Sequence, residues 1–230
     1  MNKPIALTPP MGWNSWNTFT WDINEKMICE MADRMVEDGY LEAGYEYLVI
    51  DDCWSLKQRD ADGNLVPDPE KFPHGMKWVS DYVHGKGLKF GMYSCAGTHT
   101  CAGYPGSFEH EFQDAKKFAE WGVDYLKYDY CFKPRQIPGE ILYKRMSLAL
   151  KNCGREILFA ACNWGTDGVY DWIRSSGAHT YRSTGDIQDN WESITNLAIS
   201  QMGKEPYTGN FCHNCLLYTS PSPRDYAASR

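Results

Sequence analysis

The chain has 230 residues, enough for one large domain or two small ones, and an α/β barrel typically needs about 250 residues. Its 43% hydrophobic content allows a sizeable core and excludes a disordered or collagen-like chain. The formal net charge is −7 and no basic run occurs, which excludes nucleic acid as an expected partner. Aromatic residues make up 14% of the chain, which fits either core packing or stacking on sugar rings.

The sequence predicts no membrane span and no secretory signal. Its longest apolar runs, such as 157–162, are far shorter than the roughly 20 residues that a membrane helix needs. Residues 1–12 contain no apolar h-region, so this chain is expected to carry no signal peptide. The expected compartment is the cytoplasm, or a secreted or periplasmic location if the true start lies upstream.

Six short segments are predicted as buried strands, and five of them end in polar residues typical of a site. Apolar stripes at helical spacing lie between them, and we expect these stripes to pack in the core. The first stripe follows Asn24, a good N-cap residue, and the last comprises Trp191, Ile194 and Ala198. The predicted strands are, in chain order, 11–16, 46–52, 88–93, 124–129, 157–163 and 178–182.

Such regular alternation predicts a parallel sheet with helical crossovers. The sheet could be an open doubly wound sheet or a (β/α)8 TIM barrel. No G-x-G-x-x-G or G-x-x-x-x-G-K-[ST] motif follows the first strand, which disfavours a nucleotide-binding open sheet. Charged and aromatic residues end several strands, as in barrel enzymes, so the sequence favours an α/β fold of the TIM-barrel type.

Six βα units are visible where a complete barrel needs eight. Residues 201–230 are too few for two more units, and 216–225 is rich in serine and proline without strand or helix periodicity. The stretch 215–225 also looks like the translation of a sequencing adapter. We therefore expect residues 1–214 to form a partial catalytic barrel, and residues 215–230 to be a disordered or non-native tail.

Lys127 and Asp129 are two residues apart in a predicted strand, so their side chains should share one face near the carboxyl rim of the sheet. A neighbouring ammonium favours the ionised carboxylate and lowers its pKa, which suits a nucleophile. A structural ion pair is the alternative interpretation.

Asp51 and Asp52 end the most apolar strand. Paired carboxylates there can hold two sugar hydroxyls, bind a divalent metal or simply cap a loop. Lys127 and Arg182 on neighbouring or facing strand ends argue against a metal, and no H-E-x-x-H pattern occurs. We therefore predict neither a metal site nor a cofactor.

Asp186 follows the sixth strand on a glycine-containing loop, four residues after Arg182. It could be a second catalytic carboxyl, with Arg182 ordering either the substrate or Asp186 itself, or it could cap the next helix, as could Asp189. Together with Asp129 it would supply the two carboxyls that glycoside hydrolysis requires, with pKa values pushed apart by their surroundings.

Six motifs follow one another along the chain: Thr8-Pro-Pro-Met-Gly-Trp-Asn-Ser-Trp16, Ile50-Asp-Asp-Cys-Trp54, Leu65-Val-Pro-Asp-Pro-Glu-Lys-Phe-Pro73, Cys101-Ala-Gly-Tyr-Pro-Gly-Ser107, Leu126-Lys-Tyr-Asp129 and Arg182-Ser-Thr-Gly-Asp-Ile-Gln-Asp-Asn-Trp191. In this order, over about residues 5–200, the chain resembles the melibiase-type α-galactosidases of glycoside hydrolase family 27.

The resemblance implies that Asp129 is the nucleophile and Asp186 the acid/base of a retaining double displacement. It further implies a disulfide between Cys101 and Cys131. The substrate-binding residues that it implies are Asp51 and Asp52 for the galactose 4- and 6-hydroxyls, Lys127 and Arg182 for ring hydroxyls, and Trp16 and Tyr93 as walls of the pocket.

The chain departs from the family pattern in three ways. Asn163 stands where relatives often carry the Glu that reads the sugar 2-substituent, although Asn can still hydrogen-bond a 2-hydroxyl. Trp21 stands where many relatives have the cysteine that pairs with Cys53, so Cys53 is expected to be a free core thiol. The family's seventh-strand Trp-Asn-Asp-Pro-Asp segment and its C-terminal β-sandwich do not occur in this sequence.

The expected function is that of a retaining α-galactosidase releasing terminal α-D-galactose from galacto-oligosaccharides, galactomannans or galactoconjugates. Alternatives in the same family are an α-N-acetylgalactosaminidase and a β-L-arabinopyranosidase, which Asn163 and Asp51–Asp52 would distinguish. Alternatives of another class are a non-catalytic sugar-binding barrel and an inactive fragment, since six of eight units would expose two parallel sheet edges.

Overall fold

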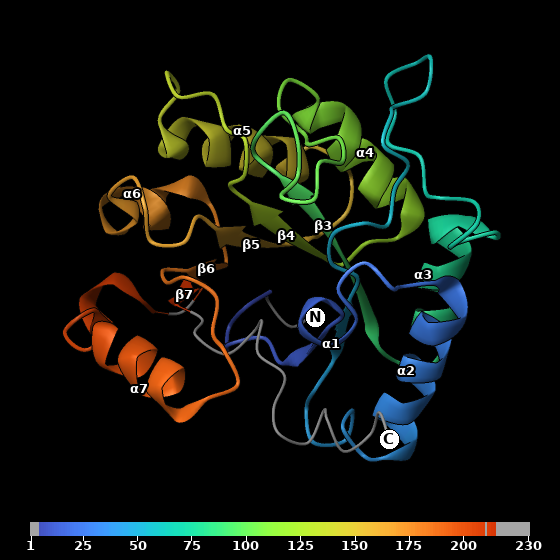
Figure 1. Ribbon diagram of the computed structural model, residues 1–230, viewed down its shortest axis with the longest axis horizontal. Helices are drawn as coiled ribbons and strands as arrows, with labels where there is room; N and C mark the ends of the chain where they lie inside the picture. The colour runs from blue at the N-terminus through green and yellow to red at the C-terminus, as the bar shows by residue number, and fades with distance from the viewer. Residues whose placement is uncertain (1–4, 210, 215–230) are drawn as a thin grey trace.

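Seven parallel strands form one sheet in which each strand pairs with the next along the chain (Figure 1). The computed structural model describes residues 5–209 and 211–214. This arrangement confirms the α/β fold and the incomplete barrel. The strands are β1 (Gly12–Asn14), β2 (Tyr47–Val49), β3 (Lys89–Cys95), β4 (Tyr125–Asp129), β5 (Leu158–Cys162), β6 (Thr180–Arg182) and β7 (His213–Asn214).

Helices lie between the strands, and neighbouring helices α2 to α6 pack against one another. Asn24 caps the second helix as predicted, because its side chain accepts a 3.0 Å hydrogen bond from the Met27 N–H. No helix in the described part of the chain is long and apolar enough to cross a bilayer. The helices are α1 (Trp16–Phe19), α2 (Glu25–Glu37), α3 (Gly75–Gly85), α4 (Glu111–Trp121), α5 (Gly139–Lys151), α6 (Val169–Ser176), α7 (Trp191–Ser200) and a 3-10 turn (Glu205–Tyr207).

A small apolar cluster is separate from the main core that β-strands and helices share. In β4, Tyr125 belongs to this cluster, and Lys127 and Asp129 follow it at the period of two that keeps side chains on one face. The sheet face is therefore apolar toward the amino ends of its strands and charged at their carboxyl ends. The cluster comprises Ala6, Tyr47, Val49, Tyr125, Leu158 and Ala160.

The first described residues reach across to the last strand. The carbonyl of Ala6 accepts hydrogen bonds from the Phe211 N–H at 3.1 Å and from Nε2 of His213 at 2.9 Å. Gly12 allows β1 to pair closely with β2, because a Cβ at this position would lie 2.2 Å from the Tyr47 carbonyl oxygen. The segment before β1 thus contacts the segment that carries β7, although the two are about 200 residues apart in sequence.

The structure corrects two predictions on the fold. It has a seventh strand, β7, whose two residues are too few to show any periodicity in the sequence. The predicted core stripe on α7 is wrong, because α7 buries no residue and the Trp191 side chain is 79% exposed. In Figure 1 this helix lies beside β6 and β7, away from helices α2 to α5. The tail predicted at 215–230 lies outside the described residues.

Candidate active site

Asp51 lies just after β2 and is held on several sides. Its Oδ2 accepts hydrogen bonds from Nδ2 of Asn14 at 2.6 Å and from Nζ of Lys127 at 2.7 Å. Its own backbone N–H donates to the Ser15 hydroxyl at 3.0 Å. The carboxyl ends of β1, β2 and β4 thus meet at one buried ion pair.

Asp52 holds two loops together. Its Oδ1 accepts from the Cys53 N–H at 2.7 Å and its Oδ2 from the Ala102 N–H at 3.1 Å. Cys53 has a φ of 69°, a strained conformation for a side chain that is not glycine. It is a free, buried thiol, as predicted. Asp52 therefore has a loop-capping role, although each carboxylate oxygen can accept a further hydrogen bond.

Asp129 ends β4 and is buried. Its Oδ2 accepts from the Tyr93 hydroxyl at 2.9 Å, and its Oδ1 accepts from the Tyr130 N–H at 2.9 Å. The predicted disulfide between Cys101 and Cys131 is confirmed, with Cα atoms 5.2 Å apart. Two hydrogen bonds thus fix the orientation of the carboxylate.

The predicted lowering of the Asp129 pKa is wrong. Burial raises the pKa of this carboxyl more than the charge of Lys127 lowers it. Lys127 gives its direct hydrogen bond to Asp51, and it lies over the Tyr93 ring at 5.2 Å from the centroid. Burial disfavours the Lys127 ammonium, yet the charge of Asp51 leaves the pKa of this lysine raised.

Unfolding should report the raised pKa of Asp129. Because the pKa of Asp129 is raised in the folded chain, ionising this carboxyl destabilises the fold. The stability present below its ordinary pKa of 3.8 is therefore lost as the pH rises through the pKa of the folded state. We expect Asp129→Asn to gain stability relative to the unaltered chain as the pH rises from about 4 towards neutral, by about 1.4 kcal/mol for each unit by which folding raises the pKa of Asp129. Urea unfolding across this range measures it, and a constant or shrinking difference would contradict the pKa assignment.

Arg182 and Asp186 form an ion pair at the end of β6. Nη1 of Arg182 donates to Oδ1 of Asp186 at 2.5 Å, while the Asp186 side chain is 72% exposed. The N-cap of α7 is Asn190, which accepts from the Ser193 N–H at 2.8 Å, so neither Asp186 nor Asp189 has this role. Nε of Arg182 is buried and has no hydrogen-bond partner within the described residues.

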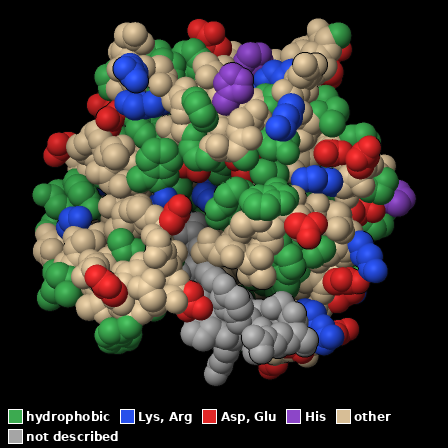
Figure 2. Space-filling model, viewed as in Figure 1, with side chains coloured by type: hydrophobic (Ala, Val, Ile, Leu, Met, Phe, Trp, Pro, Cys, Tyr) green, Lys and Arg blue, Asp and Glu red, His purple; other side chains and the backbone are tan. Residues whose placement is uncertain are grey.

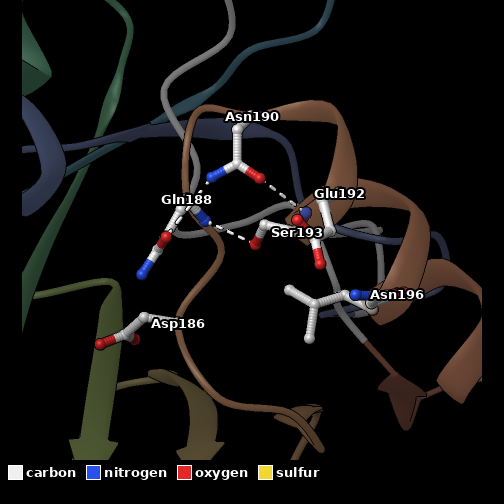
Figure 3. A pocket seen from close by; sticks show the side chains of 7 residues that line it. Asp186, Gln188, Asn190, Glu192, Ser193 and Asn196 are labelled. Carbon is white, nitrogen blue, oxygen red and sulfur yellow. Dashed lines mark hydrogen bonds between the residues drawn. The ribbon is translucent and has the colours of Figure 1, made fainter.

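Asp186 lines a shallow cavity of about 480 Å³ beside the start of α7 (Figure 3). Gln188, Asn190 and Ser193 form its hydrogen-bonded wall, with the Gln188 N–H donating to the Ser193 hydroxyl at 2.9 Å. On a face of the molecule shown in Figure 2, acidic and basic side chains gather near the centre with hydrophobic ones around them. The exposed carboxyl of Asp186 and the buried carboxyl of Asp129 thus have different surroundings.

The two remaining predicted site residues, Trp16 and Asn163, form hydrogen bonds with nearby residues of their own loops. Trp16 begins α1 and is partly buried, and its N–H donates to Oδ1 of Asn14 at 2.9 Å. Asn163 is fully buried, and its amide bonds Thr166 O at 2.7 Å and the Gly165 N–H at 3.3 Å. The side chain of Asn163 therefore shapes the turn after β5.

Sequence reasoning missed Asn14 as part of this site. Asn14 bonds both Asp51 and the backbone of Trp16, and thus links two predicted substrate residues. The available signal was its position, since it is a polar residue at the carboxyl end of the first strand, as the predicted site residues are on later strands.

An incomplete barrel with carboxylates and cations at the carboxyl ends of its strands has the site placement of a TIM-barrel enzyme. Residues 8–205 match the family described as alpha galactosidase A (Melibiase_2). The chain belongs to this melibiase family.

Individual relatives agree with the family match. Alpha-galactosidase 2 of Arabidopsis thaliana is 53% identical over 199 residues, which are 86% of this chain and 50% of that protein. Alpha-galactosidase of Coffea arabica is 53% identical over 195 residues, covering 84% of this chain and 51% of that protein. The chain superposes on the α-galactosidase of Saccharomyces cerevisiae solved with raffinose with a TM-score of 0.87 and 38% identity, covering 91% of this chain and 52% of that one. The chain thus spans about half the length of these relatives.

Proposed function

We propose that the full-length protein is a retaining α-galactosidase that releases terminal α-D-galactose from oligosaccharides, galactomannans or galactoconjugates. The observation that carries this proposal is the buried Asp129 carboxylate, held by Tyr93 and Tyr130, on a barrel whose sixth strand leads to a second carboxyl at Asp186. The relatives named α-galactosidases and the relative solved with raffinose support the choice of sugar.

In the proposed mechanism an oxygen of Asp129 attacks the anomeric carbon. The bond between that carbon and the leaving oxygen breaks, and this oxygen takes a proton from Asp186. Water then attacks the galactosyl-enzyme, gives its proton to Asp186 and frees Asp129, so the anomeric configuration is retained. The Tyr93 hydroxyl, 2.9 Å from Oδ2, orients the nucleophile throughout.

Sugar binding is assigned to the charged groups around Asp129. The carboxylate oxygens of Asp51 and Asp52 accept from the 4- and 6-hydroxyls, while Lys127 and Arg182 donate to ring hydroxyls. Support for Arg182 comes from its buried Nε, a donor left without a partner within the described residues. Trp16 and Tyr93 are assigned as apolar walls of the pocket, and Asn163 is assigned to the 2-substituent.

Comparative kinetics test the substrate. We expect the full-length protein to hydrolyse an aryl α-galactoside with a kcat/KM at least about tenfold above those for the aryl α-N-acetylgalactosaminide and β-L-arabinopyranoside, because one poorly fitted substituent costs 1–3 kcal/mol. A preference for either rival glycoside would overturn the sugar assignment while leaving the two-carboxylate mechanism in place. Binding of galactose without hydrolysis of any of the three would favour a non-catalytic sugar-binding barrel.

A further inference from the structure

The disulfide lies directly against the Asp129 carboxylate. Sγ of Cys101 is 3.6 Å from Oδ2 of Asp129, and one ligand-type atom from each of Cys101, Asp129 and Cys131 lies within 4.8 Å of the others. Cys101 is exposed, whereas Asp129 and Cys131 are buried. A small solute can therefore reach this group of three residues through Cys101.

We propose that reduction of the disulfide converts these residues into a binding site for a thiophilic divalent cation such as Zn²⁺ or Cd²⁺. The two thiolates and the Asp129 carboxylate are the ligands. This mixed sulfur and oxygen set suits borderline-soft cations, while Mg²⁺ and Ca²⁺ prefer oxygen alone. In the oxidised chain both sulfur atoms are bonded to each other, so the site exists only after reduction.

A dithiol supplies the two electrons that reduce the disulfide. A thiolate of the dithiol attacks Sγ of the exposed Cys101, and Cys131 leaves as a thiolate. The second thiol of the reductant then closes its own disulfide and releases Cys101, so two electrons pass from the dithiol to the protein. A bound cation displaces the remaining protons of the two thiols to solvent.

The separations fit a tetrahedral cation. With Zn–S bonds of about 2.3 Å and a Zn–O bond of about 2.1 Å, neighbouring sulfur and oxygen ligands lie about 3.6 Å apart. This is the separation already present between Cys101 and Asp129. The two sulfur atoms must part from about 2.05 Å to about 3.8 Å, which side-chain rotation can supply.

The surroundings favour such a site. The Tyr93 hydroxyl bonds Oδ2 of Asp129 and orients it, as groups around metal ligands commonly do. Gly97 lets the loop that carries Cys101 approach the one that carries Cys131, since a Cβ there would lie 1.9 Å from the Cys131 carbonyl oxygen. Two thiolates and a carboxylate leave one negative charge around a divalent cation, and the charges of Lys127 and Arg182 act on Asp129 to offset it.

The test uses the 230-residue chain and cadmium, and it needs no catalytic activity. The chain is reduced with a dithiol, freed of reductant without oxygen, and titrated with CdCl₂ while the ultraviolet absorption of the cadmium–thiolate bond is followed. We expect the reduced chain to bind one more Cd²⁺ than the reduced Cys101→Ser/Cys131→Ser variant, which keeps every other cysteine. Equal stoichiometry in the two would overturn the proposal.

Asp129→Asn separates an ordered site from a bare pair of thiols. This variant keeps both cysteines and should bind the extra Cd²⁺ at least about tenfold more weakly, because a carboxylate ligand is lost. Unchanged affinity would overturn the proposal, and this is also the result that an unfolded reduced chain would give. Because the readout is cadmium binding, failure of the proposed hydrolysis would not affect the outcome.

Discussion

Asp129→Asn should lower kcat for an aryl α-galactoside in the full-length protein by at least about 10³-fold, because an amide cannot form the glycosyl-enzyme. The substitution keeps the shape of the side chain and leaves an oxygen to accept from Tyr93 or Tyr130. Galactose binding should therefore be reduced far less than turnover. Steady-state kinetics together with a binding titration measure both quantities.

A matched control for this variant is Asp81→Asn. Asp81 is an exposed partner of Lys77 on α3 and makes none of the contacts assigned to the site, so its loss should leave turnover within about twofold. Normal turnover in Asp129→Asn would show that the nucleophile has been assigned to the wrong carboxyl.

Lys127→Met should destabilise the fold by about 3–5 kcal/mol, because it leaves the Asp51 carboxylate buried without its counter-ion. The side chains of Lys127 and Asp51 are only 8% and 2% exposed, so water cannot replace the lost hydrogen bond. The total stability of a domain is commonly 5–15 kcal/mol, which makes this a large fraction of it. Urea unfolding of the 230-residue chain measures the loss.

Lys89→Met is the control for burial. Lys89 pairs with Glu46 at 2.6 Å, but both side chains are close to half exposed, so its loss should cost less than about 1 kcal/mol. A Lys127→Met/Asp51→Asn double variant should recover part of the stability by removing the unpaired charge. Equal losses for Lys127 and Lys89 would show that the ion pair with Asp51 contributes no more than a surface pair.

Much of the fold could be predicted because the patterns that mark strands, short apolar runs and a period of two, are local in the sequence. Each predicted strand overlaps an observed one, although β3 runs two residues beyond the predicted 88–93, to Cys95. The period of two in β4 identified Lys127 and Asp129 as neighbours on one face. The N-cap role of Asn24 could be predicted from its residue type, and the free thiol of Cys53 from the family pattern. Local sequence therefore located the carboxyl ends of the strands, where the candidate site lies.

The pairing within the site could not be predicted in the same way. Lys127 is two residues from Asp129, yet it bonds Asp51, which is 76 residues away. Which carboxylate binds the lysine depends on the positions that β2 and β4 take on either side of β3 in the assembled sheet. The burial that raises the pKa of Asp129 likewise comes from the assembled sheet.

Helix α7 is a case in which the sequence predicted a contact that the structure does not show. Its apolar residues at helical spacing predicted a core contact, but periodicity describes a face without saying what covers it. Within the described residues no element buries this face, and Trp191 remains exposed. The two-residue strand β7 had no pattern to detect, and it is held by hydrogen bonds with β6 and with Ala6, some 200 residues earlier.

The proposed mechanism requires Asp129 to form a covalent galactosyl-enzyme. Treating the full-length protein with an activated, fluorinated α-galactoside whose glycosyl-enzyme hydrolyses slowly should trap this species, and peptide mass spectrometry should place one added sugar on Asp129. A sugar on a different carboxyl would contradict the assignment, and hydrolysis with inversion and no trapped sugar would contradict the retaining mechanism.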